Sequence, residues 1–298
     1  MKVYLEPQTD SRGIMRVRDA LIRYAPKEIE LSSLGECDLA ILHVFGRNTS
    51  THETVQWLRT HEKQYAVIQY VLRSSMRPNT KDWIDIWNDA KLVWSYYDLV
   101  ALCKEDELGY FHEDSWEMEA FPFYYAPLGV DGSVFFDRLL GHDTFKILAS
   151  AQHALSESVR ECSFAVKKIN KKMIHLGHEL RRGKDIFCIK GISDVRLAEY
   201  YSQCEFVSGL RRIEGFEFPV IEGAMCGARP IVFDRPEMRH WFKEFSIFIP
   251  EGKREQVIES LVDTFRYGAM PVTEDEKKLI AARFNWETII KGFWERIL

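Results

Sequence analysis

The stretch Ser208-Gly-Leu-Arg-Arg-Ile-Glu-Gly-Phe-Glu-Phe-Pro-Val-Ile-Glu-Gly-Ala-Met-Cys-Gly-Ala-Arg-Pro-Ile-Val-Phe-Asp234 says most about the fold. It begins at the end of the hydrophobic run 206–209, which predicts a short strand, and passes through a turn containing Gly215. A helix is expected from about Pro219, because proline is favoured in the first turn of a helix. Residues 230–233 then form a second apolar run. This order predicts one strand–helix–strand unit of a parallel sheet.

The same alternation of apolar runs and helix-period stretches continues in both directions and predicts an α/β protein. We expect two Rossmann-like domains that face one another across a cleft. The expected parts are an N-terminal domain at 1–142, a second domain at 143–284 and a terminal helix at 285–298 that packs toward the first domain.

Composition favours an ordinary globular protein. The 298 residues suggest about two domains, with 46% hydrophobic and 29% charged residues. No apolar run approaches the roughly 18 residues of a membrane helix, and the first residues do not resemble a secretory signal. We therefore expect a cytoplasmic protein with no integral membrane segment. The six cysteines form no CxxC pair, so neither a zinc site nor a redox dithiol is indicated.

The charge is unevenly distributed along the chain. Residues 1–142 hold 15 Lys/Arg and 22 Asp/Glu, a net charge of −7, whereas residues 143–298 hold 25 and 23, a net charge of +2. An acidic first half disfavours general binding of a polyanion, and the second half suits a phosphorylated small molecule better.

Two carboxylates and a glycine stand out in the opening stretch. Glu214 lies in the loop, and Glu222 lies about one helical turn past Pro219, so both can face a ligand at the start of the helix. The free N–H groups and the dipole of a helix N-terminus suit a diphosphate. Gly215 lets the backbone approach a ligand closely, because it has no Cβ.

Residues 214–231, Glu-Gly-Phe-Glu-Phe-Pro-Val-Ile-Glu-Gly-Ala-Met-Cys-Gly-Ala-Arg-Pro-Ile, resemble a motif of the retaining glycosyltransferases of family 4, which have the GT-B fold. That family carries two glutamates separated by seven residues in the setting E-G-F-G-x-P-x-x-E-A-M-A-x-G-x-P-V. Pro127-Leu-Gly-Val-Asp131, followed by Phe135, is similar to the family's P-N-G-V-D-x-x-x-F. The resemblance covers about residues 120–298.

The resemblance implies that the domain at 1–142 binds the acceptor and that the domain at 143–284 binds the nucleotide-sugar donor. It also implies a role for several residues. Glu214, the expected catalytic residue, would hold the hydroxyls of the donor sugar, and Glu222 would hold the ribose of the nucleotide. Gly215, Phe216 and Phe218 would offer backbone N–H groups to the sugar and phosphate. Gly13 would approach the β-phosphate from the first domain. Transfer would proceed with retention of configuration, by attack on the same face of the sugar, with neither a metal nor a cofactor.

The sequence departs from the family pattern at the diphosphate site. The family's G-R-x-x-x-x-K-G is replaced by the stretch 149–158, which lacks both basic residues. A charge-assisted contact to phosphate contributes roughly 1.5–3 kcal/mol, so a replacement is expected. The candidates are Arg211, Arg212, Arg12 and Lys190, which precedes Gly191. The family's usual histidine of the first domain is also missing; Gln69 or Tyr70 stands at about that position.

The expected function is transfer of a sugar from a nucleotide-sugar donor, such as a UDP- or GDP-sugar, to an acceptor hydroxyl. The acceptor would be a saccharide, another small molecule or modified DNA. One alternative is a phage-type DNA glycosyltransferase acting on hydroxymethylated pyrimidines. Another is a non-catalytic nucleotide-sugar binder, because both basic residues are missing. A dinucleotide-dependent oxidoreductase is disfavoured, since no GxGxxG motif follows an expected strand.

Overall fold

The computed structural model describes residues 1–7, 12–44, 49–70, 80–99, 122–151, 158–177, 184–212 and 215–298. Contacts divide the chain into two compact units. The first consists of Met1–Leu128, Ile213–Gly215 and Trp286–Leu298, and the second of Gly129–Arg212 and Phe216–Asn285. Each unit is built on a six-stranded parallel sheet.

The sheet of the first unit has the strand order β2-β1-β3-β4-β5-β6. Two of its central strands, Leu39–Val44 and Leu92–Ser95, are buried along their whole length, because helices cover both faces of a parallel sheet. The elements are β1 (Lys2–Leu5), α1 (Arg12–Arg23), β2 (Glu30–Leu31), the 3₁₀ helix Leu34–Glu36, β3 (Leu39–Val44), α2 (Thr49–Thr60), β4 (Gln64–Gln69), α3 (Thr80–Asn88), β5 (Leu92–Ser95), β6 (Phe123–Tyr125) and α11 (Trp286–Ile297).

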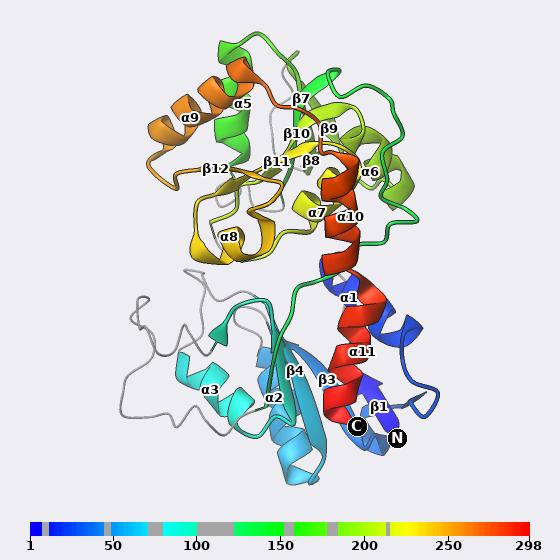
Figure 1. Cartoon of the computed structure of the whole chain (residues 1–298). Helices are drawn as coiled ribbons and strands as arrows, with labels where there is room; N and C mark the ends of the chain where they lie inside the picture. Colours follow the sequence, from blue (N-terminus) through cyan, green and yellow to red (C-terminus); the bar gives the residue numbers. More distant parts are fainter. Residues whose placement is uncertain are drawn as a thin grey trace. The chain divides into compact units, whose positions relative to one another are not determined.

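Helices cover the first sheet on two sides. In Figure 1, α2 and α3 lie on one side of the strands and α11 on the other. Helix α11 contacts both α1 and β5, and Tyr124 donates a hydrogen bond of 2.9 Å to the carbonyl oxygen of Ile289. The rings of Trp94 and Phe293 lie 5.5 Å apart. The C-terminal helix therefore returns to the first unit, as expected.

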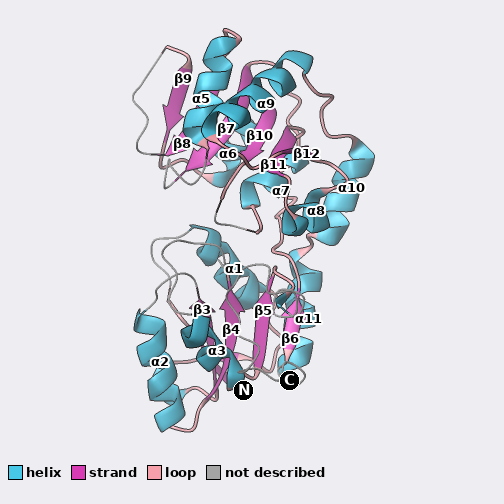
Figure 2. Cartoon of the chain, turned by 90° about the vertical axis from the view of Figure 1, so that its left-hand side faces the viewer, coloured by secondary structure: helices cyan, strands magenta, loops and turns pink. Residues whose placement is uncertain are grey.

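The sheet of the second unit has the order β12-β11-β10-β7-β8-β9, and Figure 2 shows its strands with the helices around them. Its elements are β7 (Phe145–Ala151), α5 (Val159–Lys168), β8 (Met173–Gly177), β9 (Ile186–Ile189), α6 (Asp194–Tyr201), β10 (Cys204–Gly209), α7 (Phe218–Met225), β11 (Arg229–Phe233), α8 (Pro236–Phe242), β12 (Ile247–Ile249), α9 (Arg254–Tyr267) and α10 (Glu274–Arg283).

One face of the second sheet packs on α5 and α9, which also pack on each other, to form a core of aliphatic and aromatic side chains. The other face packs on α6 and α7, and α10 packs on α7. The predicted fold class, two parallel α/β halves, is therefore confirmed. The sequence patterns did not predict β2, α8 and β12, which are too short, at two to seven residues, to show a periodicity.

The segment 129–142, which we expected in the first domain, groups with the second unit. The backbone N–H of Val130 donates to the carbonyl oxygen of Phe284 at 2.8 Å. Farther along, the Asp137 carboxylate lies 3.1 Å from the Lys277 ammonium and 3.2 Å from the His142 imidazole. The contacts with Phe284 and Lys277 tie the segment to α10 and the residue that follows it.

Within the described part of the chain, no helix combines the length and the apolar composition needed to span a membrane. Cysteines 37, 162, 188, 204 and 226 are free thiols, and Cys103 lies outside the described residues.

Two glycines allow α7 to lie unusually close to β10. A Cβ added to Gly209 of β10 would lie 2.3 Å from the Cγ2 atom of Val220, and one added to Gly223 of α7 would lie 2.6 Å from the Cγ1 atom of Val207. Neither distance is compatible with normal van der Waals packing. The start of α7 is therefore held against the carboxyl end of β10.

We predict that Gly223→Ala destabilises the protein even though alanine is the better helix former. Overpacking against Val207 costs about 1–3 kcal/mol and the gain in helix propensity is about 1 kcal/mol, so a net loss of up to about 2 kcal/mol is expected. Chemical denaturation measures it. Gly35→Ala is the matched control, because nothing lies within 4 Å of the added Cβ. Equal stability of the two variants would contradict the packing argument.

Candidate functional site

The candidate site begins at the point where the strand order of the second sheet reverses. The chain enters at β7, places β8 and β9 on one side of it, and then places β10, β11 and β12 on the other. Ligands of open α/β sheets bind outside the carboxyl ends of the two strands at such a switch point, here β7 and β10. Leu210 follows β10, and the arginines 211 and 212 come next.

Arg211 reaches from the end of β10 to the end of β7. Its Nη2 atom donates to the hydroxyl of Ser150 at 3.2 Å, and its Nε atom lies 3.1 Å from Oε2 of Glu217. Glu217 is only 1% exposed and stands just before α7. Arg211 is thus positioned at the switch point with a carboxylate beside it. Glu217 occupies the position where the family motif has its second glycine.

Arg212 points toward the start of α5. Its Nη1 atom donates to the hydroxyl of Ser158 at 2.6 Å, and its guanidinium lies over the ring of Phe233, 4.9 Å from the centroid. Ser158 is the N-cap residue of α5 and has a left-handed backbone, with φ of 43°. Arg212 therefore extends to the N-terminal end of a helix, where an anion is favoured.

The buried Arg235 fixes the backbone that carries these two arginines. It donates to the carbonyl oxygen of Arg211 at 2.8 Å and to that of Arg212 at 3.2 Å. Its own charge is accompanied by carboxylates of Glu237 and Glu251, at 3.7 and 3.8 Å. The sequence drew attention to Arg211 and Arg212 but not to Ser150, Ser158, Glu217 or Arg235 as their partners.

Glu222 lies on α7 and is only 2% exposed. The hydroxyl of Tyr201 donates to its Oε2 atom at 3.4 Å. The carboxylate is therefore closed off from solvent in this structure, and a ribose would reach it only if a neighbouring side chain moved. Its expected role in binding the nucleotide stays a prediction.

The other motif residues have different surroundings. Phe216 is a core residue whose ring packs on Trp241, Phe242 and Phe284, so only its backbone is available to a ligand. Phe218 begins α7 and contacts Phe216 edge to face.

Two further motif residues precede Phe216. The expected catalytic residue, Glu214, lies outside the described residues. Gly215 is buried against Tyr97, where an added Cβ would lie 2.4 Å from the ring.

The structure does not bring Lys190 together with the two arginines. Lys190 follows β9, the outer strand of the sheet, three strands from β10, which corresponds to about 14 Å at a spacing of ~4.8 Å. Gly191 has a left-handed φ of 62°, which favours glycine. Arg12 and Gly13 begin α1 of the first unit, and Arg12 is exposed.

The first sheet also has a switch point, between β1 and β3, and a buried polar cluster lies there. Glu6 follows β1 and accepts from the backbone N–H of His43 at 2.8 Å and from the hydroxyl of Thr51 at 3.2 Å. Nδ1 of His43 lies 2.8 Å from the hydroxyl of Tyr70, which follows β4. The sequence signal for this cluster was the presence of polar residues at the ends of apolar strands.

Burial sets the protonation of this cluster. Burial, assisted by the positive charge of Arg18, lowers the pKa of His43 to about 3. Burial and the negative charge of Glu6 raise the pKa of Tyr70 well above its ordinary value. At neutral pH the imidazole is therefore uncharged and the phenol keeps its proton, which is the state in which the two groups share a hydrogen bond.

Among the residues that the structure describes, no group of three or more His, Cys, Asp or Glu side chains is arranged to hold a metal ion.

Comparisons with known proteins identify solved structures that share this fold. No protein-family model and no curated protein sequence matches the chain. Sucrose-phosphate synthase from Thermosynechococcus elongatus is similar in structure, with a TM-score of 0.68 and 14% identity over 87% of this chain and 72% of that one. The pneumococcal O-GlcNAc transferase GtfA, solved with UDP and GlcNAc, has a TM-score of 0.66 and 13% identity over 96% of this chain, which spans only 60% of that enzyme.

A glycosyltransferase from Rickettsia africae ESF-5 matches almost end to end. Its TM-score is 0.65 at 12% identity, over 99% of this chain and 96% of that one. The chain therefore has the two-sheet α/β fold of these glycosyltransferases.

We predict that His43 makes the stability of the first unit depend on pH. The unfolded chain binds a proton near pH 6.5 and the folded chain only near pH 3, so stability falls as the pH is lowered from 6.5 toward 3, by up to about 1.4 kcal/mol per pH unit. His43→Gln removes this contribution. Denaturation of both proteins between pH 7 and pH 4 measures the difference.

The control for this measurement is His61→Gln, because that side chain lies exposed after α2. The control should keep the pH dependence of the unsubstituted protein. A His43→Gln variant with an unchanged pH profile would show that His43 is protonated equally in both states.

Proposed function

We propose that the protein is a retaining, metal-independent glycosyltransferase that takes a sugar from a nucleotide-diphosphate donor such as a UDP- or GDP-sugar. The observation that carries the proposal is the pair Arg211 and Arg212 at the switch point of the second sheet, beside the start of α7. The diphosphate would lie over this edge. The fold shared with known glycosyltransferases supports the class of reaction.

The two arginines offer a replacement for the basic pair that the family motif has after the first strand of its donor domain. They come from the end of β10 instead, yet Arg211 contacts Ser150 of β7 and Arg212 contacts Ser158 of α5. The two arginines therefore bring positive charge to both ends of the segment 149–158, which lacks the family's basic residues. A planar guanidinium can bind phosphate oxygens in pairs, which gives both charge and orientation.

The reaction assigned to the site is displacement at the anomeric carbon. The bond between that carbon and the donor phosphate breaks, the acceptor hydroxyl forms the new bond on the same face, and its proton passes to the departing phosphate. Arg211, Arg212 and the N-terminal end of α7 would stabilise the charge that develops on the diphosphate. Glu214 would hold the hydroxyls of the sugar.

The second candidate is a nucleotide-sugar binder without turnover. The ion pair between Arg211 and the buried Glu217 favours it, because a carboxylate beside the phosphate site offsets part of the positive charge. The two candidates differ in turnover and not in donor binding.

The experiment that tests the proposal is a thermal-shift screen with UDP, GDP, ADP and their sugars, followed by assay of donor hydrolysis and transfer with EDTA present. Retention is read from the anomeric coupling constant of the product by NMR. Binding with slow, EDTA-resistant hydrolysis supports the enzyme. Binding without hydrolysis supports the second candidate, and the absence of any shift contradicts both.

We predict that Arg212→Ala raises the donor KM about tenfold or more, because a charge-assisted phosphate contact contributes roughly 1.5–3 kcal/mol. Donor titrations in the hydrolysis assay measure it. Arg266→Ala, which removes an exposed arginine of α9, is the control and should leave the KM unchanged. An unchanged KM for Arg212→Ala would remove this residue from the phosphate site.

We predict the opposite effect for Glu217→Gln. The substitution keeps a hydrogen-bond acceptor for Arg211 but removes the buried negative charge, so donor binding should become about three- to tenfold tighter. Calorimetric titration with the nucleoside diphosphate measures it. Weaker binding would mean that Glu217 orients Arg211 rather than competing with the phosphate for it.

A further inference from the structure

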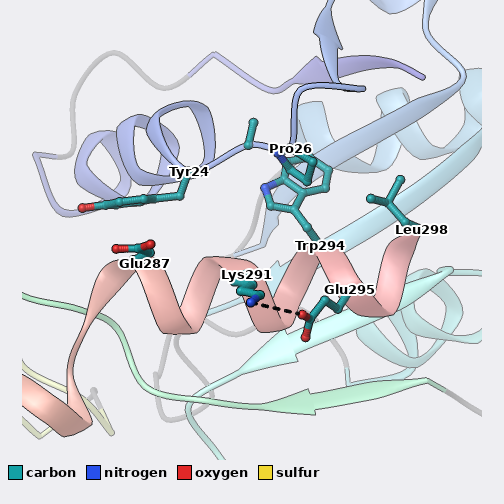
Figure 3. A pocket seen from close by; sticks show the side chains of 8 residues that line it. Tyr24, Pro26, Glu287, Lys291, Trp294, Glu295 and Leu298 are labelled. Atoms are coloured by element: carbon teal, nitrogen blue, oxygen red, sulfur yellow. Dashed lines mark ion pairs between the residues drawn. The ribbon is translucent and has the colours of Figure 1, made fainter.

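A pocket of about 340 Å³ opens on the first unit between the end of α1 and α11 (Figure 3). Its volume falls in the range of small-molecule sites. The strands of this sheet are parallel, and α1 connects the carboxyl end of β1 to the amino end of β2. The end of α1 therefore lies near the edge of the sheet where the strands begin. The pocket is therefore separate from the switch point of the sheet. Its walls come from Tyr24, Pro26, Glu287, Lys291, Trp294 and Glu295.

A buried hydrogen-bond donor faces this pocket. Trp294 is only 1% exposed, and its indole Nε1 atom has no hydrogen-bond partner among the described residues. In Figure 3 this nitrogen lies on the side of the ring that is directed toward Tyr24, across the pocket. A buried donor without an acceptor is destabilising, so a ligand that reaches it after a small movement of a neighbouring side chain would supply the missing hydrogen bond.

The same helix, α11, also offers hydrogen-bond acceptors to the pocket. The Glu287 carboxylate lies beside Tyr24 in Figure 3, and within the described part of the chain it forms no hydrogen bond or ion pair. Glu295 lies 3.9 Å from the ammonium of Lys291. Two carboxylates and one ammonium leave a net negative wall, which disfavours a phosphate or a carboxylate ligand.

These walls specify the chemistry of the ligand. It has to accept a hydrogen bond from the indole and donate one to a carboxylate, and it has to carry no negative charge. A hydroxyl group does both. The ring of Tyr24 and the ring of Pro26 add apolar surface, which suits the C–H face of a sugar ring.

We propose that this pocket binds one sugar ring of a neutral saccharide, with the Trp294 indole donating to one hydroxyl and the Glu287 carboxylate accepting from another. The site is an accessory saccharide site of the first unit. It uses none of the residues assigned to the donor, and it stands whether or not the chain transfers sugar.

The test is a titration of the full chain with methyl glucoside, methyl galactoside and N-acetylglucosamine, followed by the indole N–H resonances in ¹⁵N NMR spectra. Trp294→Phe identifies the resonance of this tryptophan. We expect that resonance to move on binding, and Trp294→Phe and Glu287→Gln each to weaken binding about three- to tenfold. Glu259→Gln, an exposed carboxylate of α9, is the control for the charge change and should bind normally.

Three results would overturn the proposal. The first is no saturation by any of the three sugars up to about 50 mM. The second is saturable binding that neither substitution weakens, which would place the sugar elsewhere. The third is an equal shift of the same resonance by inorganic phosphate or by N-acetylglycinamide, which would mean that the pocket selects an anion or an amide instead of a hydroxyl. Glu287 is exposed, so Glu287→Gln should leave the fold intact. It therefore tests the saccharide site even if Trp294→Phe lowers the stability of the protein.

Discussion

The close approach of α7 to β10 is the constraint on which the second unit depends. Gly209 and Gly223 permit this approach, since a Cβ added at either position would lie under 3 Å from a valine side chain. This contact sets where α7 starts and thereby where Glu217 and Glu222 stand relative to the ends of β7 and β10. A small change in backbone separation would move Glu222 and the start of α7 relative to the two arginines that follow β10.

Electrostatic balance is the second feature of the site. The arginines 211, 212 and 235 lie close together, and each has a carboxylate within 4 Å: Glu217, Glu161 and Glu251. Three positive charges so close to one another would repel without these partners. The carboxylates offset this repulsion, and they would compete with the diphosphate of the proposed donor for the arginines.

Much of the fold was predictable because its strands and helices are long enough to show a period. Helix α5 was expected at 159–168 and is found there, and the alternation of strand and helix predicted two parallel sheets. Short elements such as β12, with three residues, carry no period. The assignment of 129–142 to the second unit depends on contacts with Phe284 and Lys277, which lie far away in the sequence.

The sequence by itself determined the class of fold, the candidate motif at 214–231 and the absence of the usual basic pair, because these are properties of local order and spacing. Only the tertiary structure decided which of the candidate cations share a site. Arg211 and Arg212 meet Ser150 and Ser158, whereas Lys190 lies three strands from β10, because strand order in a sheet differs from strand order in the chain. The indole of Trp294 and the carboxylate of Glu287 likewise form a pocket only because α11 packs beside α1.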